Sequence, residues 1–289
     1  MADIQLWIEG ARLRTLPAAA APVIIGSAIA ADFGGFSLLR ALLALSVALA
    51  LQIGCNYAND YSDGIRGTDE FRQGPPRLTA SGTTSPKRVL AAALISFAVA
   101  GVFGLILLAL SGTWILLTIG IAAIAAAWFY TGGKRPYGYL GLGEIFVLIF
   151  FGYVATLGTI YTQILQLPKI GWIFGTGIGL IACAILMVNN IRDIPTDIKA
   201  GKRTLAVRLG DTKARYAFTA MLGFPLFFPA LVLMQFEFFI FIILLPAVWV
   251  IAHPVLQGAK AKKLIPALKQ TGFYELAYAM LGSFLILWF

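Results

Sequence analysis

Four carboxylates follow an almost uncharged apolar run in the first quarter of the chain, within "NYANDYSDGIRGTDEF": Asp60, Asp63, Asp69 and Glu70. Asn56 opens this stretch four positions before Asp60, and Asp63 comes three positions after Asp60. Residues three and four apart share one face of a helix. The spacing therefore predicts a helical face that presents an amide and two acids toward one point.

A second stretch, "NNIRDIPTDIKAGKRT", repeats this pattern later in the sequence. Asn189 precedes Asp193 by four positions, and Asp197 follows four positions later. Pro195 lies between the two acids, and proline removes a backbone hydrogen bond from a helix interior. We expect a kink at this proline or a helix end within the stretch.

Carboxylates that face one another repel, and their pKa values rise unless something neutralises them. A hard divalent cation does so with oxygen ligands, and Mg²⁺ usually takes one or two carboxylates together with water and substrate phosphates. Basic side chains near the acids would contact the remaining phosphate oxygens: Arg66, Arg72, Arg77, Lys134, Lys199, Lys202 and Arg203. The pattern predicts Mg²⁺ as cofactor and a diphosphate with an apolar tail as substrate.

An aromatic and glycine-rich stretch, "WFYTGGKRPYGYLGLGE", carries Tyr130, Tyr137 and Tyr139. Ring faces stabilise cations, and glycine lets the backbone approach a ligand closely. Such a loop suits the allylic cation that a departing diphosphate leaves behind, although aromatic residues also gather at membrane interfaces for other reasons. Glu144 ends the stretch and would be costly against lipid, so we expect it to face a polar cavity.

The elements that must position these residues are apolar helices. Of the 289 residues, 60% are hydrophobic and 12% charged, against about 25% charged in soluble domains, and the mean hydropathy is +0.86. The apolar runs are continuous, which excludes the alternating pattern of a membrane β-barrel. At about 20 residues per span, we expect an all-α polytopic membrane fold of about nine transmembrane helices around a central cavity, near residues 16–34, 38–57, 88–109, 112–130, 142–163, 170–190, 215–234, 237–255 and 272–288.

Basic residues are strongly one-sided in this arrangement. With nine spans, every Lys and Arg except Arg40 and Lys169 falls on one side. Positive charge marks the cytoplasmic side, which predicts a multi-pass cell-membrane protein with its N-terminus cytoplasmic and its C-terminus outside. The net charge of +9 then reflects membrane topology and not nucleic-acid binding. The two acidic stretches lie four spans apart and so at the same face, which suggests a single domain of two similar halves, roughly 1–130 and 131–289.

The chain resembles a known family along essentially its whole length, and the resemblance is carried by the two acidic stretches and the aromatic loop. "NDYSDGIRGTD", followed by Arg77, Ser81 and Gly82, and "RDIPTDIKAGKRTLAVRLG" resemble the UbiA-type intramembrane prenyltransferases. "YTGGKRPYGYLGLGE" and "NNIRDIPTD" resemble the branch that prenylates 1,4-dihydroxy-2-naphthoate in menaquinone synthesis. The resemblance implies an all-α membrane fold whose central cavity is capped by cytoplasmic loops.

By analogy, the first magnesium–diphosphate motif would comprise Asn56, Asp60 and Asp63, and the second Asn189, Asp193 and Asp197. Many members space the first two acids by four positions and this chain by three, so either Asp63 or Asp69 completes the first site. The resemblance implies Arg77, Lys134, Lys199 and Lys202 as diphosphate contacts. Further candidates for substrate binding are Arg66, Tyr61, Tyr130, Tyr137 and Tyr139.

The implied reaction is magnesium-assisted ionisation of a polyprenyl diphosphate. The electron-rich naphthoate ring then attacks the allylic carbon and loses its carboxylate as CO₂, leading to demethylmenaquinone. Asp63 or Glu144 would act as the base that keeps a ring hydroxyl ready to donate electron density. The apolar spans would exclude water, and an opening toward membrane lipid would admit the tail.

Two alternatives remain at this point. A sister enzyme would use another acceptor, such as 4-hydroxybenzoate, homogentisate, haem B or a chlorophyllide, with the same metal chemistry. A transporter or channel would also carry intramembrane polar residues and similar halves. Against a transporter, the acids lie at one membrane face, whereas a transported substrate needs access from both.

Overall fold

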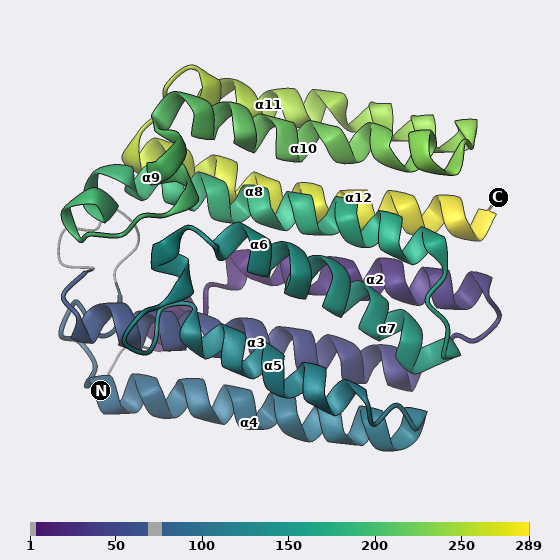
Figure 1. Cartoon of the computed structure of the whole chain (residues 1–289), viewed down its shortest axis with the longest axis horizontal. Helices are drawn as coiled ribbons and strands as arrows, with labels where there is room; N and C mark the ends of the chain where they lie inside the picture. The colour runs from purple at the N-terminus through teal and green to yellow at the C-terminus, as the bar shows by residue number, and fades with distance from the viewer. Residues whose placement is uncertain (1–3, 69–76, 289) are drawn as a thin grey trace.

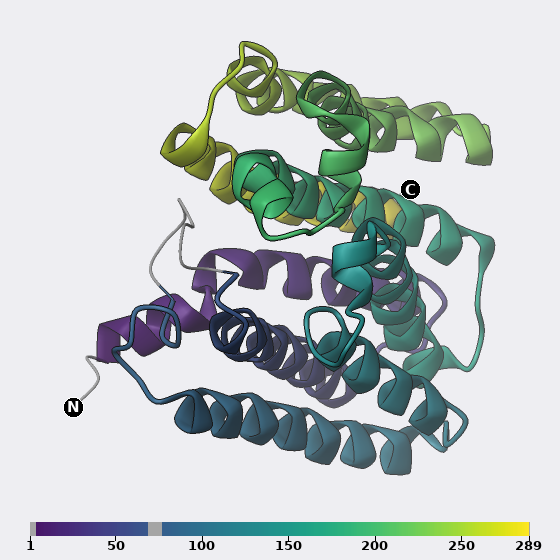
Figure 2. The same cartoon turned by 60° about the vertical axis from the view of Figure 1, so that its left-hand side comes forward.

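The computed structural model describes residues 4–68 and 77–288, and within these ranges the chain is helical with no strand. Its long helices lie side by side along the length of the molecule (Figures 1 and 2), and in Figure 1 the N-terminus lies at one end and the C-terminus at the other. The elements are α1 (Ile4–Ala11), η1 (Leu13–Thr15), α2 (Leu16–Asp32), α3 (Leu38–Ile65), α4 (Pro86–Ser111), α5 (Leu116–Phe129), η2 (Tyr137–Leu140), α6 (Gly143–Val147), η3 (Leu148–Val154), α7 (Ala155–Ile164), α8 (Lys169–Lys199), α9 (Leu205–Leu209), α10 (Asp211–Leu233), η4 (Phe236–Leu244), α11 (Leu245–Leu256), η5 (Ala261–Leu264) and α12 (Ile265–Trp288).

Helices occur at each predicted apolar segment, and the all-α membrane fold is confirmed. Seven of the helices in the described ranges are long and apolar enough to cross a membrane. The exact count of nine is not confirmed, because α5 is short at 14 residues and α12 is not among the seven. The apolar stretch of α12 contains the fully buried Glu275.

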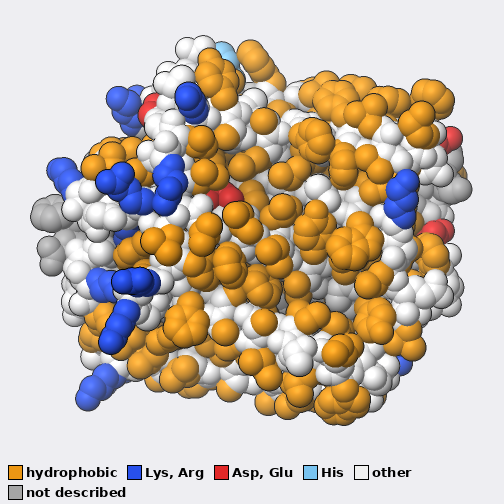
Figure 3. Space-filling model, in the orientation of Figure 1, with side chains coloured by type: hydrophobic (Ala, Val, Ile, Leu, Met, Phe, Trp, Pro, Cys, Tyr) orange, Lys and Arg blue, Asp and Glu red, His pale blue; other side chains and the backbone are white. Residues whose placement is uncertain are grey.

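The outer surface of the bundle is apolar, as a lipid-facing surface must be. On α4, Leu94, Ile95 and Val102 expose more than half of their surface. Figure 3 shows hydrophobic side chains over most of the visible face, with Lys and Arg gathered at one end. Exposed apolar area of this extent marks a surface that contacts lipid, and the chain is therefore a multi-pass membrane protein.

Helix α8 runs through the middle of the bundle and carries the second acidic stretch. It continues past Pro195 and ends at Lys199, so the predicted helix end does fall within that stretch. Its apolar half packs closely on η3, where a Cβ on Gly152 would lie 2.6 Å from the Gly175 carbonyl oxygen. Only glycine permits this approach. The η3 segment is a π-helix, a local widening that occurs often at functional sites.

At the end of the bundle away from the acids, Arg40 ties two helix ends together. Its guanidinium donates to the carbonyl oxygens of Thr162 (3.2 Å) and Gln163 (3.4 Å) in α7 and of Leu110 (2.7 Å) in α4. These carbonyls belong to last turns, which lack partners within their own helices. A cation there is also favoured by the helix dipole.

We expect Arg40→Met to lower the free energy of unfolding by about 1–3 kcal/mol, because the three carbonyls lose charge-assisted hydrogen bonds. The apparent melting temperature in detergent measures this. Lys169→Met is the matched control, since Lys169 makes one such bond, to Val232 at 3.3 Å. Equal losses in the two variants would contradict the capping role.

Candidate active site

The bundle encloses a cavity of about 930 Å³, lined by residues from helices α2 to α8 and from the loops at the charged end of the bundle. Most of its lining is apolar and includes Gly101, Gly120 and Gly158, where an added Cβ would meet nothing within 4 Å. Acids, amides and bases line the opposite end. The cavity thus combines room for an apolar chain with a charged end.

Residues 56–65 of the first acidic stretch form the last turns of α3, and only some of them line the cavity. Asn56 and Asp63 do, whereas Asp60 is fully buried and is not among the lining residues. The two carboxylate oxygens of Asp60 accept hydrogen bonds from the backbone amides of Leu78 and Thr79, both at 2.9 Å. In this structure Asp60 holds the segment after Arg77 in place, so its assignment as a metal ligand rests on the sequence pattern.

Asn59, which was not among the predicted site residues, lines the cavity as well. Its side-chain oxygen accepts a hydrogen bond from the Thr131 hydroxyl at 2.8 Å. Asn59 and Asp63 have the same spacing of four as Asn189 and Asp193. This repeated spacing could have identified Asn59 from the sequence.

Asp63, near the end of α3, contacts two segments that are distant from it in sequence. The Tyr139 hydroxyl donates to its Oδ1 at 2.5 Å, and the Lys202 ammonium lies 3.4 Å from the same oxygen. Lys202 also lies 4.6 Å from the centre of the Tyr139 ring. All three residues line the cavity, so the structure brings the first acidic stretch, the aromatic loop and the segment after α8 to one place.

The second acidic stretch contributes Asn189, Asp193 and Asp197 to the same cavity. The Arg192 guanidinium binds Asp193 through two hydrogen bonds of 2.7 and 2.6 Å. Arg192 is buried and was not predicted as a site residue. The residues near position 60 and near position 195 therefore share one cavity, as the repeated spacing predicts.

Several predicted residues lie elsewhere among the described residues. Glu144 is buried outside the lining and accepts a hydrogen bond from Asn190, a lining residue, at 3.2 Å. Asp69 lies outside the described residues. Further predicted side chains lie outside the lining. Arg66 donates to the carbonyls of Thr131 and Gly133, and Tyr61 stacks on Trp128. The predicted bases Lys134, Lys199 and Arg203 are exposed and also lie outside the lining, and Arg72 lies outside the described residues.

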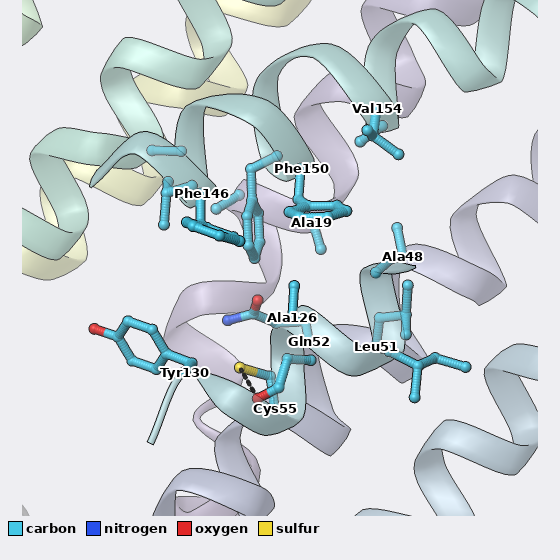
Figure 4. Close-up of a pocket in the computed structure, with 18 of the residues that line it drawn as sticks. Ala19, Ala48, Leu51, Gln52, Cys55, Ala126, Tyr130, Phe146, Phe150 and Val154 are labelled. Atoms are coloured by element: carbon cyan, nitrogen blue, oxygen red, sulfur yellow. Dashed lines mark hydrogen bonds between the residues drawn. The ribbon is translucent and has the colours of Figure 1, made fainter. Parts of the chain in front are cut away.

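Aromatic rings form one wall of the cavity. Tyr137 stacks on Phe146 with centroids 3.9 Å apart, and Tyr130 meets Tyr137 edge to face at 5.5 Å. Figure 4 shows Phe146 and Phe150 projecting toward the pocket from one side, with Gln52 and Cys55 across from them. These π faces carry no nucleophilic atom and suit a cation or a planar ring.

The donor set fits a hard divalent cation. Asp63, Asp193 and Asp197 supply carboxylate oxygens at the charged end, and amide side chains lie beside them. In the described part of the chain no three acidic, His or Cys side chains are close enough to hold a metal by themselves. Mg²⁺ commonly binds through one or two carboxylates and completes its shell with water and substrate phosphate, which matches such a sparse set.

Burial, and next the charge of Asp63, raise the pKa of Tyr139 above its ordinary value. The phenol therefore stays protonated at neutral pH and donates to Asp63. We expect Tyr139→Phe to lower kcat/KM about tenfold, equivalent to about 1.4 kcal/mol for one lost hydrogen bond. Steady-state kinetics check this. Tyr57→Phe is the control, because Tyr57 donates to the Trp7 carbonyl away from the cavity, and an equal loss there would argue against a site role.

Known proteins resemble this chain in sequence. The sequence pattern of the UbiA prenyltransferase family matches residues 19–275. A 1,4-dihydroxy-2-naphthoate octaprenyltransferase of Mycobacterium tuberculosis is 46% identical over 281 residues, covering 97% of this chain and 96% of that protein. A protein of the same name from Escherichia coli is 42% identical over 217 residues, covering 73% of this chain and 70% of that protein.

Solved structures share the fold. A UbiA homolog from Aeropyrum pernix superimposes with a TM-score of 0.70 at 15% identity, over 91% of this chain and 96% of that one. A UbiA homolog from Archaeoglobus fulgidus, bound to GPP and Mg²⁺, superimposes with a TM-score of 0.60 at 17% identity, over 94% of this chain and 99% of that one. On its sequence, its helical fold and its matching relatives, the chain belongs to the UbiA prenyltransferase family.

Proposed function

We propose that the protein transfers a polyprenyl group from a polyprenyl diphosphate to 1,4-dihydroxy-2-naphthoate, with loss of CO₂, in menaquinone biosynthesis. Relatives named for this activity, up to 46% identical over 97% of the chain, support it. The structural observation that carries it is the cavity of about 930 Å³ with an apolar interior and the acids and bases at one end. That shape suits a diphosphate head and a long apolar tail.

The charged end would hold the diphosphate. Asp63, Asp193 and Asp197, assisted by the amide of Asn189, would hold Mg²⁺, whose bound charge would favour departure of the diphosphate. The UbiA homolog of Archaeoglobus fulgidus bound to GPP and Mg²⁺ supports a divalent metal here.

The chain's own cations complete this end. Lys202 and Arg77 line the cavity and would bind phosphate oxygens directly. Their positive charge stabilises the negative charge that develops as the allylic carbon–oxygen bond breaks.

The acceptor ring supplies the electrons for the new bond. As the carbon–oxygen bond breaks, its electron pair leaves with the diphosphate, and a ring carbon forms a carbon–carbon bond to the allylic carbon. The bond to the ring carboxylate then breaks, its electron pair restores aromaticity, and CO₂ leaves. The immediate product is the quinol, which reaches demethylmenaquinone by a separate two-electron oxidation.

Asp63 is the stronger candidate for the base, because it lines the cavity and Glu144 does not. As a carboxylate it would accept a hydrogen bond from a ring hydroxyl and raise the electron density of the ring. Glu144 would instead orient Asn190, which donates to it at 3.2 Å. The aromatic wall and the apolar spans keep water away from the allylic cation.

We also propose that the charged end faces the cytoplasm in a cell membrane, with the N-terminus inside and the C-terminus outside. The positive-inside rule supports this orientation. The exceptions on the other side are Arg40 and Lys169, which cap helix ends. Figure 3 shows the resulting asymmetry of charge.

The experiment is prenyl transfer by the purified full chain in detergent with Mg²⁺, with products identified by mass spectrometry. We expect a prenylated naphthalenediol from 1,4-dihydroxy-2-naphthoate and release of one CO₂ per turnover. 4-Hydroxybenzoate and homogentisate are the competing acceptors. Product from either of these and none from the naphthoate would overturn the proposed acceptor.

A further inference from the structure

Arg12 has an unusual backbone where α1 meets η1. Its φ and ψ are 54° and 57°, the left-handed region that non-glycine residues avoid. The other non-glycine residues with positive φ in the described ranges are Leu165, Met234 and Ala261. Strained backbone of this kind persists only where the surroundings hold it, and it is concentrated at ligand sites.

A hydrogen-bond network holds the turn. The Arg12 amide donates to the Glu9 carbonyl (3.1 Å), and the Arg12 carbonyl accepts from the Thr15 amide (2.8 Å) and the Thr15 hydroxyl (2.9 Å). Gln52 of α3 donates to the Thr15 hydroxyl at 2.8 Å, and Asn56 donates to the Ala11 carbonyl at 3.0 Å. The turn is thereby fastened to the polar face of α3.

Arg12 lines the main cavity together with Gln52 and Asn56. It also lines a second pocket of about 40 Å³, with Arg14, Arg77 and Arg192 around it. Asn56 lies seven residues before Asp63 on α3, about 10 Å along a helix. The turn that carries Arg12 is bonded to α3 at the level of Asn56, deeper than the Asp63–Lys202 pair at which the diphosphate is placed.

At this deeper level the cavity forms a slot between aromatic and polar side chains. Phe146 and Phe150 lie on one side of the pocket, and Gln52 and Cys55 lie across it (Figure 4). Aromatic side chains of this kind stack on planar rings. An acceptor must lie beside the allylic carbon, between the diphosphate and the tail, which is where this slot is.

We infer that Arg12 binds the carboxylate of the aromatic acceptor, with the ring in the slot beside Phe146 and Phe150. This rests on the proposed transfer to a hydroxynaphthoate. A guanidinium matches a carboxylate through two parallel hydrogen bonds. Arg12 would therefore distinguish a ring that carries a carboxylate from one that does not, and would set the orientation of the ring toward the allylic carbon.

The test compares ligands within one protein. We would measure KM for 1,4-dihydroxy-2-naphthoate and for the prenyl diphosphate, and the inhibition constants of 1-hydroxy-2-naphthoate and its neutral carboxamide. In Arg12→Gly, we expect the naphthoate KM and the carboxylate inhibition constant to rise roughly 10- to 100-fold, the range for a charged hydrogen bond. The carboxamide inhibition constant and the prenyl diphosphate KM should stay within about twofold.

Glycine is chosen because it accepts positive φ without strain, so the variant should fold, and its melting temperature checks this. Arg12→Lys keeps the charge without the bidentate geometry, so its naphthoate KM should lie between those of the unaltered protein and Arg12→Gly. Arg14→Met is the matched control, since Arg14 lines only the small pocket, and its constants should be unchanged.

Other outcomes overturn the inference. A rise in the prenyl diphosphate KM alone would assign Arg12 to the diphosphate, and equal shifts for carboxylate and carboxamide would mean a purely structural role. An unchanged naphthoate KM in Arg12→Gly would exclude any acceptor contact. Failure of the proposed function is separate, because the unaltered protein would then give no product from the naphthoate.

Discussion

Replacing Asp193 by Asn should lower kcat/KM for prenyl transfer by about 100-fold or more, the scale of removing a charge that acts in the transition state. Asp193 lines the charged end of the cavity, and the amide keeps its shape while removing the charge that would bind Mg²⁺. Steady-state kinetics with the naphthoate and a polyprenyl diphosphate measure this loss.

Stability must be separated from chemistry in this experiment, because Asp193 is also the partner of the buried Arg192 at 2.6 Å. A buried guanidinium without its carboxylate partner lowers the free energy of unfolding by about 3 kcal/mol or more. The double variant Asp193→Asn/Arg192→Leu removes the unpaired charge and should recover most of the stability without recovering activity. Recovery of activity in the double variant would show that Asp193 serves only to neutralise Arg192.

A matched acid–arginine pair outside the cavity gives the control. Asp211 binds Arg215 at 2.8 Å at the start of α10, and neither lines the cavity. Asp211→Asn should leave kcat/KM within about twofold. A loss there comparable to that of Asp193→Asn would mean that the assay reports stability alone.

Replacing Asp60 by Asn should act in a different way, through the fold. The carboxylate is fully buried and accepts the backbone amides of Leu78 and Thr79. An Asn side chain has one acceptor oxygen, so its NH₂ group would face a backbone N–H. We expect a loss of about 2–4 kcal/mol in the free energy of unfolding, measured by melting temperature in detergent, together with greater proteolysis of the segment after Arg77.

Asp63→Asn is the comparison, since Asp63 lines the cavity and Asp60 does not. It should lose activity with a smaller change in melting temperature. A stable but inactive Asp60→Asn protein would contradict the structural role and favour Asp60 as a metal ligand, as the spacing of Asn56, Asp60 and Asp63 suggests.

The fold class and the gathering of charge at one end of the bundle were predictable from the sequence. Apolar runs specify spanning helices because lipid leaves backbone groups no partner outside the segment. Even so, composition could not decide how many helices span. The predicted span 142–163 is one apolar helical segment from Gly143 to Ile164, built from α6, η3 and α7. The predicted span 112–130 corresponds to α5, whose 14 residues are fewer than the about 20 that cross a bilayer.

The site was partly predictable. The types of residue and their repeated spacing identified Asn56, Asp63, Asn189, Asp193 and Asp197, all of which line the cavity, and Lys202, chosen as a base near the motifs, lines it too. Lys134 and Lys199 were chosen because they are basic and near the motifs, and both are exposed outside the lining. Nearness in sequence does not determine which way a loop side chain turns.

By itself the sequence determined that charge gathers at one end of an apolar helical bundle and that two amide–acid pairs recur there. It could not choose between Asn56–Asp60 and Asn59–Asp63, because both pairs have the spacing of one helical face. The tertiary structure distinguishes the two pairs, because the backbone amides of Leu78 and Thr79 pack against Asp60 and satisfy its oxygens outside the cavity lining. Asp63 is left to meet Tyr139 and Lys202 in the cavity. Such contacts between distant segments depend on how whole helices pack, which local spacing does not encode.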